Sequence, residues 1–122
     1  MAVGDLTTAP SQTTVETFFQ VDIRTGQVQR AEPFPEARRP AIKMWIDFGE
    51  QIGVKASSAQ ITDLYKPEDL IGRTVLAVVN LPPRRIAGFV SEVLVLGVPT
   101  SSTGDVVLIR PDREVEPGLR LM

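Results

Sequence analysis

Two consecutive prolines, Pro82 and Pro83, separate two strongly apolar stretches of the chain. Proline has no N–H to donate to a sheet, and the residue before a proline is pushed toward an extended conformation. The flanking stretches, 74–79 and 93–96, are rich in Val and Leu, which is typical of strands with little solvent-facing surface. The sequence therefore predicts two strands joined by a stiff loop at 81–85.

That loop carries two adjacent cations, Arg84 and Arg85, and no acidic residue occurs between Leu70 and Ser91. It is a local positive patch on a chain whose formal net charge is −2. Arginines beside a turn are also an ordinary solvated surface feature. The residue pattern alone leaves a binding role and plain solvation open.

The composition argues against most classes of enzyme. The 122 residues include no Cys and no His, so the chain has no thiol nucleophile, no thiolate metal site and no neutral-pH proton shuttle. No Gly-x-x-x-x-Gly-Lys-Ser/Thr motif is present to cradle nucleotide phosphates. We therefore expect a protein without enzymatic activity that uses neither a metal nor a cofactor.

The apolar runs are too short for a membrane protein. None approaches the ~20 residues that cross a bilayer, and the N-terminus has no cationic region followed by an apolar core. We expect a cytoplasmic protein that does not insert into membranes. Residues 1–12 are small and polar and predict a flexible N-terminus, and residues 13–122 predict a single domain.

A short helix is expected at 13–19. Thr13 and Glu16 have the spacing of a capping box, in which each side chain accepts a backbone N–H at the helix start. Val15, Phe18 and Phe19 follow at i, i+3 and i+4 and form an apolar stripe. That stripe either covers an open end of the domain or packs against a partner chain.

The first strands are predicted from alternation. Residues 21–31 begin with apolar residues at every second position, and the parity changes after Gly26, which indicates a bend. A proline-rich loop at 32–40 carries Phe34, which we expect to be exposed. Residues 42–48 alternate strictly, placing Ile42 and Met44 in the core and Trp45 on the outer face.

The remaining elements complete a small barrel. We expect a hairpin at 48–52, a strand at 52–56, a helical segment at 61–67 ended by Pro67, a strand at 105–110 and a short edge segment in the tail. This order predicts an all-β protein, a five-stranded OB-fold barrel. A short N-terminal helix, a small helical segment between strands 3 and 4 and a C-terminal strand extension complete it.

Four motifs, in this order, resemble the tRNA-binding domain family: Val21-Asp-Ile-Arg-Thr-Gly26, Ile46-Asp-Phe-Gly49, Tyr65-Lys-Pro-Glu-Asp-Leu-Ile-Gly72 and Asn80-Leu-Pro-Pro-Arg-Arg-Ile-Ala-Gly-Phe-Val-Ser91. The family comprises dimeric tRNA-binding proteins and domains appended to some methionyl- and phenylalanyl-tRNA synthetase subunits. The resemblance covers about residues 17–120 and implies an OB-fold.

Three further motifs are similar to the CsaA-type branch of export-related chaperones: Phe34-Pro-Glu-Ala-Arg38, Ser57-Ser-Ala-Gln-Ile61 and Pro82-Pro-Arg-Arg-Ile-Ala-Gly-Phe89. The first stands where other family members have His-Pro-x-Ala-Asp, and Ser57-Ser-Ala stands where they have Ser-Gly-Leu. Such departures favour the chaperone branch. The resemblance then implies a cytoplasmic homodimer that holds unfolded or precursor polypeptides and works with the Sec export machinery.

Two hypotheses for the binding surface follow. The favoured one is a peptide-binding surface in which apolar side chains shelter apolar client segments and cations attract them; its candidates are Phe34, Trp45, Phe89, Arg38, Arg39, Arg84 and Arg85. The alternative is a tRNA-binding module acting in trans on tRNA or a synthetase. Its candidates are Lys43, Lys55, Arg84 and Arg85 for phosphates, and Ser57, Asn80 and Ser91 for sugars or base edges. Asn80 and Ser91 are equally residues that close turns within a protein.

Overall fold

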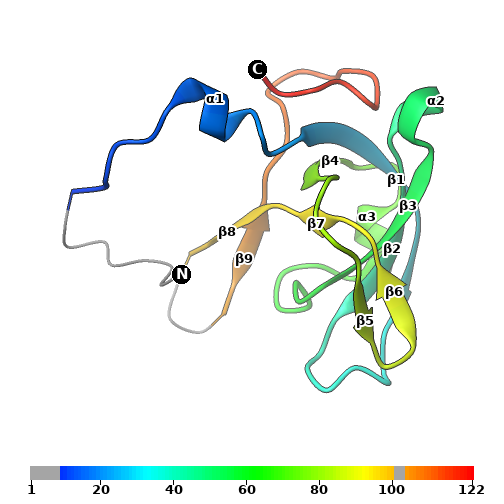
Figure 1. Ribbon diagram of the computed structural model, residues 1–122. Helices are drawn as coiled ribbons and strands as arrows, with labels where there is room; N and C mark the ends of the chain where they lie inside the picture. Colours follow the sequence, from blue (N-terminus) through cyan, green and yellow to red (C-terminus); the bar gives the residue numbers. More distant parts are fainter. Residues whose placement is uncertain (1–8, 101–103) are drawn as a thin grey trace.

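The computed structural model describes residues 9–100 and 104–122, so most of the predicted flexible segment 1–12 lies outside the described residues. Five antiparallel strands form one sheet in the order β3-β2-β1-β4-β7, which curls into a nearly closed barrel (Figure 1). The strands are β1 (Ile23–Pro33), β2 (Ile42–Asp47), β3 (Val54–Ala59), β4 (Thr74–Val78) and β7 (Leu94–Val95). The predicted all-β OB-fold class is confirmed.

Short elements surround the barrel. Two ribbons of two strands each extend from it: β5 (Arg84–Ile86) with β6 (Phe89–Ser91), and β8 (Gly97–Pro99) with β9 (Val106–Leu108). The helices are single turns: α1 (Val15–Phe18), α2 (Gly49–Ile52) and α3 (Pro67–Leu70). Helix α1 stands at one side of the barrel, away from the β5–β6 hairpin (Figure 1).

Strand β2 forms the centre of the core, as its alternation predicts. Ile42, Met44 and Ile46 are at most 1% exposed, whereas the residues between them are half-buried. Phe48, Leu70 and Val75 join the same cluster from other elements. A continuous apolar interior of this kind is the main favourable term in the folding of a domain of this size.

The bend in β1 lies a little further along the chain than predicted. The pairing of β1 with β2 shifts register between Val28 and Arg30, which marks a bulge. Gly26 lies earlier in the strand, where two core side chains pack so closely against the backbone that no larger residue fits. A Cβ at this position would lie 2.6 Å from Ile46 Cγ2 and 2.7 Å from Phe48 Cε1, and both of those side chains are fully buried.

Several predicted boundaries are wrong for local reasons. Pro67 begins helix α3 and does not end a helix, because the first helical position needs no N–H donor; residues 62–64 form only a turn. The N-cap of α1 is Thr14, whose hydroxyl accepts from Thr17 N–H at 3.1 Å, and not Thr13. The connection after β2 is the helical turn α2, and β3 follows at 54–59 and not at 52–56.

The barrel closes between β3 and residues 91–93, partly through side chains. Glu92 N–H donates to the Ala56 carbonyl, and Ala56 N–H donates to the Glu92 carboxylate at 3.0 Å. Ser58 N–H donates to the Ser91 hydroxyl at 3.0 Å. The buried Ser57 hydroxyl donates to the Val93 carbonyl at 3.0 Å. The bonds at Ala56 and Ser58 satisfy backbone N–H and C=O groups at the edge of β3. No further strand of the described residues pairs with that edge.

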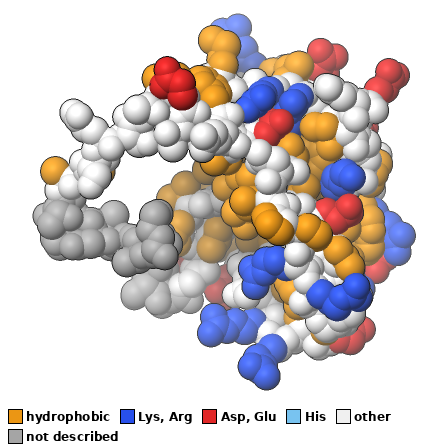
Figure 2. Space-filling model, in the orientation of Figure 1, with side chains coloured by type: hydrophobic (Ala, Val, Ile, Leu, Met, Phe, Trp, Pro, Cys, Tyr) orange, Lys and Arg blue, Asp and Glu red, His pale blue; other side chains and the backbone are white. Residues whose placement is uncertain are grey.

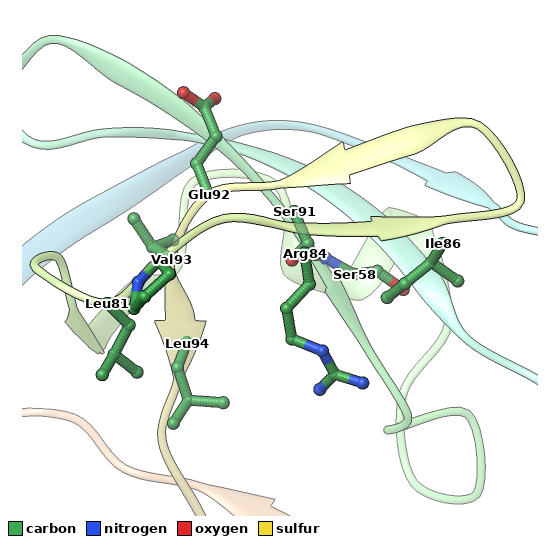
Figure 3. A pocket seen from close by; sticks show the side chains of 9 residues that line it. Ser58, Leu81, Arg84, Ile86, Ser91, Glu92, Val93 and Leu94 are labelled. Carbon is green, nitrogen blue, oxygen red and sulfur yellow. Dashed lines mark hydrogen bonds between the residues drawn. The ribbon is translucent and has the colours of Figure 1, made fainter.

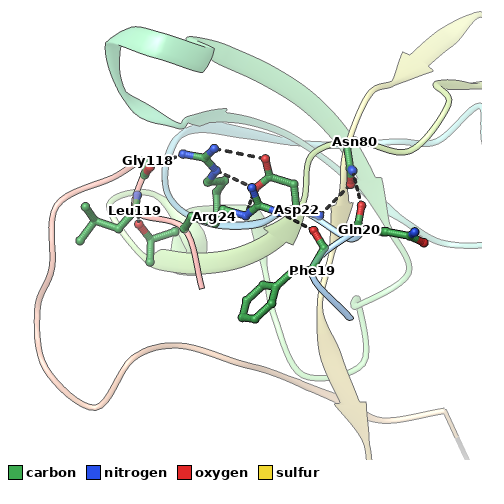
Figure 4. A network of polar contacts seen from close by, with 9 residues as sticks. Phe19, Gln20, Asp22, Arg24, Asn80, Gly118 and Leu119 are labelled. Atoms are coloured by element: carbon green, nitrogen blue, oxygen red, sulfur yellow. Dashed lines mark hydrogen bonds and ion pairs between the residues drawn. The ribbon is translucent and has the colours of Figure 1, made fainter. Parts of the chain in front are cut away.

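A polar network fastens the C-terminal tail to β1 (Figure 4). Arg24 donates to the Asp22 carboxylate at 2.6 Å and to the Gly118 carbonyl at 3.1 Å. Arg120 donates to the Phe19 carbonyl at 2.6 Å and lies 3.5 Å from Asp22. The hydrogen bond from Arg24 lowers the pKa of Asp22, against the opposing effect of partial burial. The predicted edge segment in the tail is thus a single bridge to β1.

We expect the substitution Gly26→Ala to destabilise the protein by about 1–3 kcal/mol, because the added methyl overlaps Ile46 and Phe48 and a packed core resists extra volume. Chemical denaturation measures the change in the free energy of unfolding. The matched control is Gln27→Ala, since Gln27 is the next residue of the strand and is exposed. Equal stability of the two variants would contradict the packing role of Gly26.

Candidate functional site

The segment after the two prolines is a hairpin and not only the predicted loop. Strand β5 already begins at Arg84, and a two-residue turn of Ala87 and Gly88, with φ of 46° and 83°, leads into β6. Positive φ at both positions is the geometry of a type I′ turn, which suits the twist of a hairpin. Arg84 and Ile86 share one face, and Arg85 faces the other way.

The hairpin is held on the outer face of β2 by an aromatic cluster, which we define as Phe34, Trp45 and Phe89. The Phe89 ring meets Phe34 edge-on at 5.4 Å and Trp45 at 5.8 Å between ring centroids. Cations cover the cluster: Arg30 lies 4.3 Å from the Trp45 ring and Lys43 Nζ lies 5.1 Å from the Phe34 ring. Such pairs add to the stabilisation from burial alone.

The expectation that Phe34 is exposed is wrong. Its side chain is only 4% exposed because Phe89, from a hairpin 55 positions later in the chain, packs against it. Trp45 does face outward from β2, as predicted, but it is half-buried under Phe89 and Arg30. Phe89 therefore contacts both of the other rings. Phe34 also lines a separate hollow of about 330 Å³, which its own loop forms with Thr62.

The polar candidates for RNA contacts all have partners within the protein. Ser57 and Ser91 are buried and take part in the barrel closure. The Asn80 side chain accepts from Asp22 N–H at 2.9 Å and donates to the Gln20 carbonyl at 2.8 Å. Lys55 lies 3.7 Å from the Glu92 carboxylate. Their role in RNA binding stays a prediction, and these contacts are ones that RNA would have to replace or share.

The arginine candidates remain available to a ligand. Arg38, Arg39, Arg84 and Arg85 are all exposed, and none of them has a carboxylate within 4.0 Å in the described residues. Figure 2 shows Lys and Arg side chains gathered around the lower part of the molecule, over the hairpin and the loop before β2, with apolar side chains beside them. The structure therefore brings Arg84 together with the predicted loop arginines Arg38 and Arg39, whereas Arg85 lies on the other face of the hairpin.

Three hollows meet at Ser58 and Arg84, and we call them together the Arg84 groove. Their volumes are about 150, 250 and 310 Å³. Figure 3 shows the Arg84 side chain extending between Ile86 and Leu94 along the first of them. Ser58, Ile86 and Leu94 line the groove but were not predicted from the sequence. Ile86 directly follows Arg84 and Arg85, and an apolar residue beside two cations is a signal that could have identified it. Arg38 and Arg39 line the 250 Å³ hollow together with Arg84.

Other kinds of site are not found in the described residues. No three Asp or Glu side chains in this part of the chain gather as a metal ion would require. None of the described helices is long and apolar enough to cross a membrane.

Comparison with known proteins decides the family. The model for a putative tRNA binding domain matches residues 23–120. The chain belongs to the tRNA-binding domain family. Its similarity to the CsaA branch, predicted from the motifs, is confirmed by two solved chaperones named CsaA. The one from Bacillus anthracis is 53% identical with a TM-score of 0.86, and the match covers 92% of this chain and all of that one.

The second CsaA chaperone, from Picrophilus torridus, is 47% identical with a TM-score of 0.84 and covers 91% of this chain and all of that one. A methionine--tRNA ligase of Archaeoglobus fulgidus is 33% identical over 118 residues, or 97% of this chain. The chain spans only 17% of the length of that ligase. The similarity to an enzyme is therefore confined to this tRNA-binding domain.

We expect Phe89→Ala to destabilise the protein by about 1–2 kcal/mol, less than truncation of a fully buried Phe because the ring is half-buried. Trp45 is the single tryptophan, and its emission should shift to longer wavelength when Phe89 no longer covers it. Denaturation and fluorescence measure both effects. Val90→Ala, an exposed residue on the other face of the hairpin, is the control. Unchanged Trp45 emission in Phe89→Ala would contradict the packed cluster.

Proposed function

We propose that the protein is a molecular chaperone that binds unfolded or precursor polypeptides without using ATP. The observation that carries the proposal is the 53% identity to a CsaA chaperone along the whole of that chain. By this proposal it is cytoplasmic and assists protein export together with components of the Sec machinery. It uses no cofactor, since binding and release of a client need only a surface of suitable chemistry.

The Arg84 groove supports this function. It places aliphatic side chains such as Ile86 and Leu94 beside cations that no carboxylate of the described residues neutralises. Unfolded chains expose apolar side chains together with polar backbone and charged groups. A groove with small apolar hollows and hydrogen-bonding cations contacts both kinds of group in such a chain.

The second candidate function is a tRNA-binding module that acts in trans on tRNA or on a synthetase. Two observations favour it: the family model is described as a putative tRNA binding domain, and the ligase relative carries the same domain. Arg38, Arg39, Arg84 and Arg85 would then neutralise phosphates. Such binding releases counterions and weakens steeply as salt rises.

Fluorescence anisotropy separates the two functions. We expect the purified protein to bind a labelled unfolded precursor peptide with an affinity that changes little between low and moderate salt, because part of that affinity comes from apolar contacts. Labelled bulk tRNA should bind more weakly and lose affinity steeply over the same range. A labelled folded protein of similar charge serves as the control. Tight, salt-sensitive tRNA binding without peptide binding would overturn the chaperone proposal in favour of the tRNA-binding module.

We further propose that the protein is a homodimer that pairs through α1. The exposed fractions of Val15, Phe18 and Phe19 on this helix are 67%, 44% and 36%, and none of its residues is buried. The predicted apolar stripe therefore does not cover an end of the described domain. An apolar helix face that the described residues leave uncovered is suited to a twofold contact with the same helix of a second copy.

We expect Phe18→Ser to shift the protein from dimer toward monomer at micromolar concentration, because it removes the centre of the apolar stripe. Light scattering coupled to gel filtration measures the mass. The control is Glu16→Gln, an exposed residue of the same helix outside the stripe. A monomeric wild-type protein, or a Phe18→Ser variant that stays fully dimeric, would disprove pairing through α1.

A further inference from the structure

No acidic side chain of the described residues lines the cationic hollow of the Arg84 groove. Its 250 Å³ are lined by three arginines, Arg38, Arg39 and Arg84, and otherwise by Ala37, Ala41, Ser58, Gln60 and Ile86. The arginines come from the loop before β2 and from β5, and none of them pairs with a carboxylate of the described residues. Three guanidinium groups without a counterion around one hollow attract an anion.

Of the other two hollows of the groove, the 150 Å³ one is mainly apolar and the 310 Å³ one has a mixed lining that includes several aliphatic side chains. One is lined by Leu81, Pro82, Ile86, Val93 and Leu94, and the other by Ile61, Val95, Pro99 and Val106 among others. Glu92 is their one carboxylate, and it is already engaged by Ala56 N–H and lies near Lys55. All three hollows include Ser58 and Arg84, so an occupant of an apolar hollow lies next to the cationic one.

From this arrangement we infer that the groove selects polypeptide segments in which an acidic side chain stands close to an aliphatic one. The inference rests on the proposed chaperone function. An extended chain rises about 3.3 Å per residue, so nearby side chains reach adjoining hollows. The aliphatic side chain fills an apolar hollow, and the carboxylate takes hydrogen bonds from Arg84 and the two loop arginines. Arginine suits this task because its planar fork matches a carboxylate.

The observations favour a polypeptide over RNA as the occupant. Proteins that hold single-stranded RNA offer aromatic faces on which bases stack. Here the Phe89 ring meets Phe34 and Trp45 edge-on, Phe34 is only 4% exposed, and Arg30 already covers the Trp45 ring. A phosphodiester chain would also leave the aliphatic hollows unfilled.

The test uses three labelled peptides that share one apolar sequence and differ at a single position, which is Glu, Gln or Lys. At low salt we expect the Glu peptide to bind about three- to fivefold more tightly than the Gln peptide, as for an exposed ion pair, and the Lys peptide to bind most weakly. In Arg84→Gln the Glu preference should fall to less than about twofold, while the Gln peptide keeps its affinity. Arg113→Gln is the matched control, since Arg113 is an exposed arginine that lines a different hollow.

Each contrary outcome has a distinct meaning. Equal binding of the three peptides would overturn the acidic preference and leave the chaperone proposal standing. A Glu preference that persists in Arg84→Gln, and also when Arg38 and Arg39 are changed to Gln together with it, would remove the Arg84 groove as its origin. If no peptide binds, the proposed function fails and this inference fails with it. Tight binding of an oligonucleotide that Arg84→Gln abolishes, without any Glu preference, would assign the groove to nucleic acid.

Discussion

The edge of β3 is closed against residues 91–93 by one backbone hydrogen bond, from Glu92 N–H to the Ala56 carbonyl, and by side chains that a regular strand ladder would not use. Ser58 N–H has a serine hydroxyl as its acceptor, and Ala56 N–H has the Glu92 carboxylate. An unpaired backbone donor at such a position would cost free energy comparable to a lost hydrogen bond. The hairpin β5–β6 ends at Ser91, so the same contacts hold the hairpin over β2. The barrel, the aromatic cluster and the Arg84 groove all depend on this closure.

The fold was largely predictable because its strongest signals are local. The alternation at 42–47 specifies which face of β2 is buried, and the apolar run at 74–78 marks the buried strand β4. The helix boundaries that were predicted wrongly also depend on local residues, but each of those residues fits two different positions in a helix. Pro67 is compatible with either end of a helix. Thr13 and Thr14 are both suitable N-cap residues, and Glu16, three positions after Thr13, favours Thr13 although Thr14 is the N-cap in the structure.

The candidate site was less predictable because its environment is made by residues far apart in sequence. The Ser57 hydroxyl meets a carbonyl 36 positions away, and Phe34 is buried by a ring from the β5–β6 hairpin. No periodicity in either segment carries that information. The arginines were found because exposed cations need no partner to keep their chemistry. The sequence therefore predicted which charged residues lie at the groove. It did not predict which side chains, such as Ser57 and Phe34, have partners within the fold.

In the proposed chaperone, the packing of the aromatic cluster also limits how strongly one groove would hold a client. With the Phe89 ring packed against Phe34 and Trp45, the apolar contribution would come from hollows that each take one aliphatic side chain, worth about 1.5–3 kcal/mol when fully buried. The loss of translational and rotational freedom on association offsets much of that gain. In the proposed homodimer, two such grooves engage one long flexible chain, and effective concentration raises the overall affinity. By this proposal, a short or folded polypeptide would reach only one groove, and weak single sites would select unfolded chains.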